Sequence, residues 1–192
     1  MYICDLKFSM ESSTISSFKK IIANCQEVFL KKNQDYGMSW TIMRLSSLTD
    51  QIFIKAKRIR NIQESQQNII GDSQEDEFHS IINYCIMAMI IATNTEDKLE
   101  SMQFEQLKSN YDIIVKDTLD LLTRKNTDYG EVWRDMRVSS MTDIILAKLL
   151  RIKQIEDNQG STTISEGAYS NYQDILNYSI FGIIKLTEST SQ

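Results

Sequence analysis

Residues 32–59 read KNQDYGMSWTIMRLSSLTDQIFIKAKRI, and residues 125–152 read KNTDYGEVWRDMRVSSMTDIILAKLLRI. The two stretches are identical at 16 of 28 aligned positions, where unrelated sequences would share roughly one or two. After a shift of one residue, the similarity continues in Asn83-Tyr84 and Asn177-Tyr178. The chain is therefore a tandem duplication, and we place a first helical repeat at residues 1–97 and a second at residues 98–192.

Helical periodicity runs through each copy of the repeated block and the sequence around it. Apolar residues recur every three to four positions, and no stretch alternates as a strand would. Each repeat alone is small for a stable core, so the two should pack together as one globular unit. We expect an all-α protein, a pseudo-twofold helical bundle made of two tandem three-helix repeats. The first and third helices should cover about residues 14–32 and 75–93, then about 104–125 and 169–186.

Glycines and serines mark the expected helix ends. Gly37 and Gly130 closely follow the first helix of each repeat and can take the left-handed conformation that ends a helix. Ser47-x-x-Asp50 and Ser140-x-x-Asp143 have the spacing of a capping box. The two serines therefore predict the start of the second helix in each repeat.

Composition narrows the chemistry. The chain of 192 residues has no proline and a single histidine, His79. One histidine excludes a zinc site built from several histidines and a serine–histidine–aspartate relay in both repeats. The cysteines Cys4, Cys25 and Cys85 are far apart, as expected for reduced thiols in a cytoplasmic protein. Any metal ion would need oxygen ligands, which favours Mg²⁺ or Mn²⁺ over Zn²⁺.

Charge and hydropathy restrict the partners. The net charge of −5 disfavours duplex nucleic acid as a partner, but it allows a small anion in a local basic pocket. The apolar stretch 81–92 is too short for a membrane span and is interrupted by Asn83, so no membrane partner is expected. A basic strip at residues 55–60 could bind single-stranded nucleic acid, although the second repeat does not keep it in full.

Two lysines are the strongest candidates for ligand binding. Lys55 and Lys148 lie beside the apolar stripe of the second helix, where an ammonium group must reach water or meet an anion. Arg58 and Arg151 follow one turn later on the same face. The structural interpretation is an internal ion pair with Asp50 or Asp143. The functional interpretation is a phosphate held by each Lys–Arg pair.

Acidic residues could form a metal site near these cations. The candidate ligands for Mg²⁺ are Asp50, Glu77, Asp143 and Asp174. Asp50 and Asp143 could instead serve only as acids at helix starts. The acids of the third helix are divided between the repeats, because Asp174 falls where Ser80 stands and Glu77 corresponds to Asn171.

Other polar and aromatic residues are also present in both repeats. An asparagine interrupts the apolar third helix of each repeat, Asn83 in the first and Asn177 in the second. Each could bind the edge of a base or tie two helices together. The aromatic residues beside the glycine turn could stack on a nucleobase or anchor the loop on the core. The cations of the same block could reach phosphates. These further candidates for ligand binding are Lys32, Asp35, Tyr36, Trp40, Arg44, Asn83, Lys125, Asp128, Tyr129, Trp133, Arg137 and Asn177.

The repeated block consists of K-N-x-D-Y-G-x-x-W followed by R-x-S-S-x-T-D, by K, by R-I and by a helical N-Y. This block resembles the nucleotide modification associated domain family, formerly a domain of unknown function. The resemblance covers nearly the whole chain, in the tandem form typical of Bacteroidetes, and implies a bacterial protein associated with nucleotide modification. More remotely, the chain is similar to the all-α MazG-type nucleotide pyrophosphatases, which hold Mg²⁺ with clustered acids. It departs from their E-E-x-x-E pattern, because Glu77 lacks an acid at Ser80 and Asp174 lacks one at Asn171.

Two functions remain open from the sequence. The first is a nucleotide-binding protein, with Mg²⁺ as cofactor and a pyrophosphohydrolase-like reaction as its enzymatic form. Its ligand would be a nucleotide or another phosphorylated small molecule. The alternative is a non-enzymatic helical interaction module, in which the duplicated polar residues fix loops and helix pairs while the outer face recruits a partner.

Overall fold

The computed structural model describes residues 3–65, 71, 73–161 and 167–190. These residues form helices and no strand, so the predicted all-α class is confirmed. In chain order the elements are α1 (Ile3–Tyr36), a 3₁₀ turn η1 (Ser39–Ile42), α2 (Leu45–Ser65), α3 (Gln74–Thr93), α4 (Glu96–Glu100), α5 (Phe104–Tyr129), η2 (Val132–Asp135), α6 (Val138–Asp157) and α7 (Ala168–Thr190).

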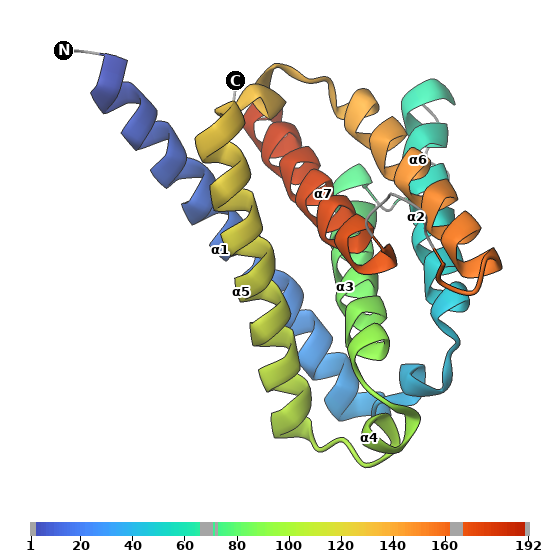
Figure 1. Cartoon of the computed structure of the whole chain (residues 1–192). Helices are drawn as coiled ribbons and strands as arrows, with labels where there is room; N and C mark the ends of the chain where they lie inside the picture. Colours follow the sequence, from blue (N-terminus) through green and yellow to red (C-terminus); the bar gives the residue numbers. More distant parts are fainter. Residues whose placement is uncertain (1–2, 66–70, 72, 162–166, 191–192) are drawn as a thin grey trace.

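The two repeats contribute matching sets of helices. The first supplies α1, α2 and α3, and the second supplies α5, α6 and α7, with the short α4 between them. The boundary that we predict after residue 97 falls within α4. The closest packing is among α2, α3, α6 and α7, which together form a four-helix core. Helices α1 and α5 lie together on one side of this core (Figure 1).

The apolar pattern of the sequence explains this arrangement. The predicted stripe of α2, Leu48, Ile52, Ala56 and Ile59, is fully buried, as is its counterpart in α6, Met141, Ile145, Leu149 and Ile152. Helices α3 and α7 are apolar around nearly their whole circumference and occupy the centre of the bundle. They approach each other closely, because a Cβ atom at Gly182 of α7 would lie 2.8 Å from the ring of Phe78 in α3.

The repeated turn after α1 and α5 is built as its glycines predict. Gly37 and Gly130 have φ angles of 66° and 68°, in the left-handed region. In the first repeat the side chain of Asn33 donates to the carbonyl of Phe29 and accepts a hydrogen bond of 2.8 Å from Trp40 Nε1. This amide therefore joins the end of α1 to the buried indole that follows the turn.

The predicted capping boxes at Ser47 and Ser140 were wrong. Helix α2 begins at Leu45 and α6 at Val138, two residues earlier in each repeat. The chain leaves each 3₁₀ turn in an extended conformation at Met43 or Met136, and the helix begins after one further residue, Arg44 or Arg137. Each serine therefore lies inside the first helical turn and does not precede it. A capping box does occur at the start of α3, between Ser73 and Asp76.

A network of polar contacts joins the two repeats. Thr49 in α2 donates to Glu156 in α6 and shares a hydrogen bond of 2.6 Å with the hydroxyl of Tyr172 in α7. The corresponding Thr142 in α6 accepts a hydrogen bond from Gln63 in α2. These reciprocal contacts are those expected of a pseudo-twofold interface.

In the part of the chain that the structure describes, no helix has the length and apolar character needed to cross a membrane.

Candidate functional site

Lys55 and Arg58 of the first repeat converge on one buried carboxylate. Lys55 Nζ lies 3.1 Å from Glu77 Oε2, and Arg58 Nη1 lies 2.5 Å from Glu77 Oε1. The Glu77 side chain is only 1% exposed. A carboxylate so deeply buried is tolerated because two cations of α2 compensate its charge. The partner of Lys55 is therefore an acid of α3, whereas the structural interpretation expected Asp50.

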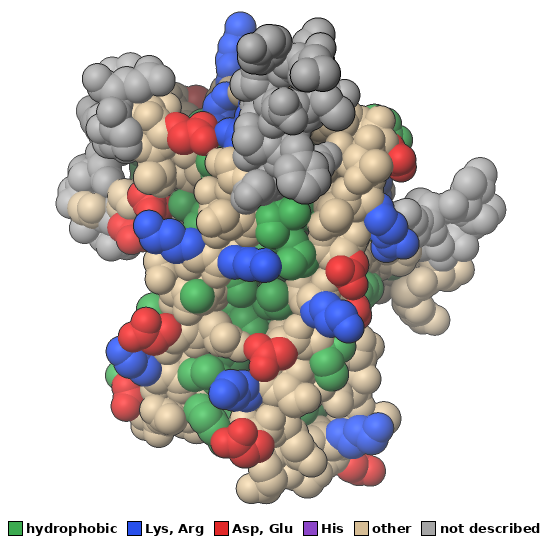
Figure 2. All heavy atoms as spheres, turned by 90° about the vertical axis from the view of Figure 1, so that its left-hand side faces the viewer, with side chains coloured by type: hydrophobic (Ala, Val, Ile, Leu, Met, Phe, Trp, Pro, Cys, Tyr) green, Lys and Arg blue, Asp and Glu red, His purple; other side chains and the backbone are tan. Residues whose placement is uncertain are grey.

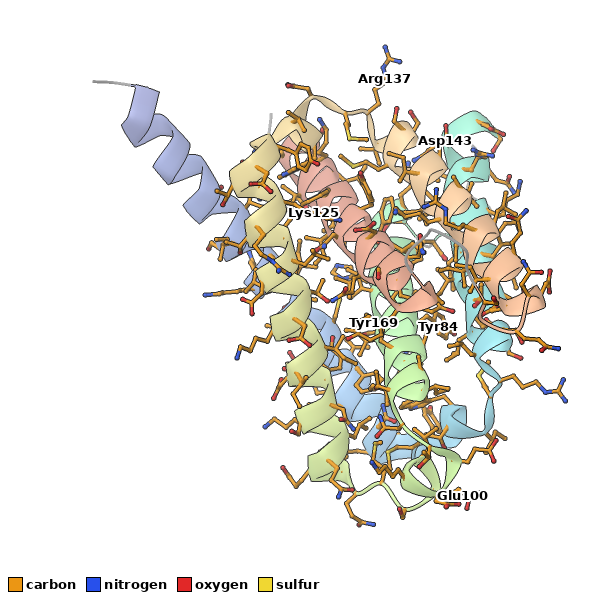
Figure 3. All side chains as sticks on the ribbon, viewed as in Figure 1. Tyr84, Glu100, Lys125, Arg137, Asp143 and Tyr169 are labelled. Atoms are coloured by element: carbon orange, nitrogen blue, oxygen red, sulfur yellow. The ribbon has the colours of Figure 1, made fainter. Side chains whose placement is uncertain are left out.

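The second repeat neutralises its lysine with a different acid. Lys148 Nζ and Lys125 Nζ each lie 2.5 Å from an oxygen of Asp174 in α7. Lys125 belongs to α5, on which Figure 3 labels it. Burial alone would raise the pKa of Asp174, but the hydrogen bonds and charges of the two lysines outweigh it and lower that pKa. Asp174 corresponds to Ser80, so the acid of the second repeat stands one helical turn beyond the position of Glu77.

A cleft of about 520 Å³ opens beside Lys55 in the first repeat. Helices α1, α2 and α3 enclose it, and it is lined by Asn24, Cys25, Val28, Phe29, Lys32, Lys55, Asp76, His79, Ser80, Asn83, Tyr84 and Met87. Its volume lies within the range of small-molecule sites. Lys32 is exposed and, among the residues that the structure describes, forms no ion pair. The cleft therefore brings together the ammonium group of Lys32, unpaired within the described ranges, and that of Lys55, which shares Glu77 with an arginine.

The hollow at the corresponding place in the second repeat has a different character. It is lined by Asp117, Asp120, Leu121, Arg124 and Gln173, and neither Lys125 nor Lys148 contributes to its wall. Both lysines are instead held by Asp174. The two repeats thus share a fold but differ in the groups that they present at this position.

Asn83 ties the cleft to the rest of the bundle. Its amide nitrogen donates to the carbonyl of Cys25 in α1 at 3.1 Å, and its oxygen accepts from the hydroxyl of Tyr111 in α5 at 3.2 Å. This residue therefore joins three helices, as the structural interpretation expects. The corresponding Asn177 is buried, whereas Asn83 is only partly buried, and the side-chain oxygen of Asn177 has no hydrogen-bond partner within the described residues.

Cys25 and His79 meet on the wall of the cleft. Cys25 Sγ lies 3.2 Å from His79 Nδ1. Burial raises the pKa of this thiol to about 12, so the sulfur stays protonated near neutral pH and is a poor nucleophile. On its other side, His79 Nε2 lies 3.7 Å from Glu75. His79 is thus a polar side chain on the wall of the cleft.

The aromatic residues of the repeated turn separate into two groups. Trp40 and Trp133 are buried, and Trp133 stacks on Phe181 with ring centroids 4.3 Å apart. Tyr36 and Tyr129 are 76% and 72% exposed, and the neighbouring Asp35 and Asp128 are exposed as well. The tryptophans therefore anchor the turn on the core, and the structure places none of these side chains on the wall of the cleft.

The four acids proposed as magnesium ligands lie apart and face cations. Asp50 pairs with Lys153 at 2.5 Å, and Asp143 pairs with Arg60, so these two acids link α2 to α6 across the repeat interface. Glu77 and Asp174 hold the lysines described above. Within the described ranges, no three His, Cys, Asp or Glu residues are grouped to hold a metal ion. These donors do not by themselves fit a magnesium site.

The remaining predicted cations lie outside the cleft. Arg44, Arg137 and Arg151 are exposed, and Arg137 points outward before the start of α6 (Figure 3). Sequence reasoning singled out Lys32, Lys55 and Asn83 but not Asn24 or Ser80. Asn24, Val28 and Lys32 follow one another at intervals of four residues, so they share one face of α1. That spacing could have revealed the wall of the cleft.

The sequence profile of nucleotide modification associated domain 1 matches residues 32–91 and 125–186, which together make up more than half of the chain. The chain belongs to this family. Both matches begin at the repeated Lys-Asn pair and end within the last helix of a repeat, as a tandem two-copy form requires. The cleft of the first repeat lies largely within the first match, apart from its α1 residues before Lys32. No curated protein and no solved structure matches the chain significantly.

Proposed function

We propose that this member of the nucleotide modification associated domain 1 family binds a nucleotide, or a closely related phosphorylated small molecule, in the cleft of its first repeat. The observation that carries the proposal is the placement of Lys32 and Lys55 on the wall of one cleft of about 520 Å³. The exposed ammonium group of Lys32, which has no carboxylate partner among the described residues, favours a ligand with negative charge when a second cation lines the same cleft.

The wall of the cleft suits the parts of a nucleotide. The ammonium groups of Lys32 and Lys55 would hold a phosphate, and the side chains of Asn24 and Ser80 offer further hydrogen bonds. Val28, which is 48% exposed, supplies an apolar surface against which a base could rest. Charged groups at one part of a pocket and apolar groups at another are typical of small-molecule sites.

The acids around the cleft favour binding of the ligand over its hydrolysis. Each acid that could have held Mg²⁺ already compensates a lysine or an arginine. A magnesium ion would therefore have to arrive with the phosphates of the ligand, and its requirement stays a prediction. Asp76, an acid on the wall, receives hydrogen bonds from the amide and hydroxyl of Ser73 at the start of α3.

Isothermal titration calorimetry with nucleoside mono-, di- and triphosphates, with and without Mg²⁺, tests this function. In the Lys32→Ala variant the affinity should fall about tenfold or more, because a hydrogen bond to a charged group contributes about 1.5–3 kcal/mol. Lys57→Ala is the matched control, since Lys57 is also exposed but does not line the cleft. If no nucleotide binds the unmodified protein, or if both variants behave alike, the proposal is wrong.

An interaction module is the second candidate, and it has an observation of its own. The duplicated Asn33, Thr49 and Asp50 of the first repeat all bond within the protein, so a structural role alone accounts for these three. Hydrophobic side chains are also exposed between the charges on the face of α1 and α5 (Figure 2). A partner protein bound equally well by the Lys32→Ala variant would favour this function over ligand binding.

A further inference from the structure

We infer that the ligand of the first repeat places a compact anionic group between Lys32 and Lys55, where the second repeat places the carboxylate of Asp174. The inference rests on the proposed function, since it assigns the anion of the same cleft. It adds the chemical class of that group, a phosphate or carboxylate with two oxygens that bridge the lysines. It also adds a stoichiometry of one ligand per chain.

The second repeat shows how such a bridge is made. Asp174 Oδ1 lies 2.5 Å from Lys125 Nζ, and Oδ2 lies 2.5 Å from Lys148 Nζ. One carboxylate therefore joins a lysine at the end of α5 to a lysine in the middle of α6. Its side chain is 14% exposed, so the bridge is largely shielded from water. Shielding strengthens the attraction between these opposite charges.

The first repeat keeps the two lysines and lacks the bridging acid. Lys32 and Lys55 correspond to Lys125 and Lys148, while Ser80 takes the place of Asp174. Ser80 has a shorter side chain than aspartate, and it lies on the wall of the cleft. In the described part of the chain, Lys32 has no carboxylate to replace the one that its counterpart holds.

Glu77 does not take over the role of the missing acid. It stands one turn before Ser80 on α3 and is 1% exposed, and its two oxygens already face Lys55 and Arg58. Glu77 fixes Lys55 from the side of the core, so that this ammonium group still lies on the wall of the cleft. With Ser80 at the position of Asp174, both lysines line a cleft that an anion from solution can enter.

Exchange of the two differing residues tests the inference. In Ser80→Asp the new carboxylate should bridge Lys32 and Lys55 as Asp174 bridges their counterparts, and the affinity for inorganic phosphate and for nucleoside monophosphate should fall about tenfold or more. Ser80→Asn is the matched control, because it adds similar bulk without charge and should keep most of the affinity. In the double variant S80D/D174S, phosphate binding should return at the second repeat, through Lys125 and Lys148.

The outcomes separate the two proposals. Binding should be measured by calorimetry with phosphate, acetate and nucleoside monophosphate as probes, and circular dichroism should verify that each variant is folded. If nucleotide binds the unmodified protein and Ser80→Asp leaves that affinity unchanged, this inference is wrong while the proposed function stands. If neither phosphate nor nucleotide binds the unmodified protein, both are wrong. If acetate competes with nucleoside monophosphate as strongly as phosphate does, the anionic group of the ligand is a carboxylate. If phosphate alone competes, that group is a phosphate.

Discussion

Single residues account for much of what the two repeats share and where they differ. Asn33 and Asp174 illustrate the two cases. Asn33 bonds to a backbone carbonyl and to Trp40, so its presence in both copies follows from the turn that it supports. Asp174 occurs in one copy only, and there its carboxylate pairs with two lysines.

Asp174→Asn should lower the free energy of unfolding by about 2 kcal/mol at pH 7, because two lysines lose their shared carboxylate. The folded protein lowers the pKa of Asp174 below its unfolded value. Its stabilising contribution is therefore present above the unfolded pKa, which is about 4, and is lost as the pH falls through the folded pKa. Urea denaturation should thus show that the difference in unfolding free energy between the unmodified protein and Asp174→Asn is smaller near pH 3 than at pH 7. Asp120→Asn, on the exposed face of α5, should show little difference at either pH.

Trp40→Phe should destabilise the protein by about 1–2 kcal/mol more than Trp133→Phe. Trp40 Nε1 donates to Asn33 Oδ1, whereas Trp133 Nε1 is buried with no partner among the described residues. Only the first substitution therefore leaves a buried acceptor unsatisfied. Thermal unfolding of both variants measures the difference, and equal losses would show that the hydrogen bond contributes nothing.

Helices of the core are placed by how closely their backbones can approach. Where α3 meets α7, Gly182 leaves no room for a side chain beside Phe78, which is fully buried. The corresponding residue in the first repeat is Ala88, so the two copies do not pack in the same way at this crossing.

Gly182→Ala should destabilise the protein by about 1–2 kcal/mol, even though alanine is the better helix former by about 1 kcal/mol. The added methyl group would lie 2.8 Å from the Phe78 ring and would force the two helices apart. Chemical denaturation measures the loss. In a Phe78→Leu background the same change should cost less, and an unchanged cost would contradict a clash with that ring.

The sequence predicts the helices better than it predicts their ends. Buried stripes such as Leu48 to Ile59 follow from periodicity alone, and the left-handed glycines follow from their position after a helix. The starts of α2 and α6 were missed because an arginine after an extended methionine carries no capping signal, while the serines two residues later do. The pairing of Lys55 with Glu77 could not be predicted, because it depends on how α2 lies against α3.

In the whole molecule, the repeats meet through α2, α3, α6 and α7 and through reciprocal polar contacts. The contacts are similar but not identical. Thr49 faces Glu156, whereas Thr142 faces Gln63 at the corresponding position. Burial raises the pKa of Glu156, although hydrogen bonds from Thr49 and Tyr172 oppose the shift.

Glu156→Gln should raise the free energy of unfolding by up to about 1 kcal/mol at pH 7 and change it little near pH 4. Because the folded pKa of Glu156 lies above its unfolded value, its protonated form stabilises the protein below the unfolded pKa, and this stability is lost as the pH rises through the folded pKa. Glutamine keeps an oxygen that can accept from Thr49 and carries no charge. Denaturation of both proteins across pH 4–8 measures how the free energy of unfolding depends on pH. Parallel pH profiles would show that ionisation of Glu156 does not contribute to this dependence.

The difference between Ser80 and Asp174 has a consequence for the origin of the chain. A symmetric dimer of single repeats must carry the same residue on both sides of its axis, so it could not place a bridging acid beside one pair of lysines and a serine beside the other. Covalent fusion removes that restriction, since each half can then mutate alone. The two halves of the duplicated protein can therefore diverge in the groups that they present, which a symmetric assembly of identical subunits does not allow.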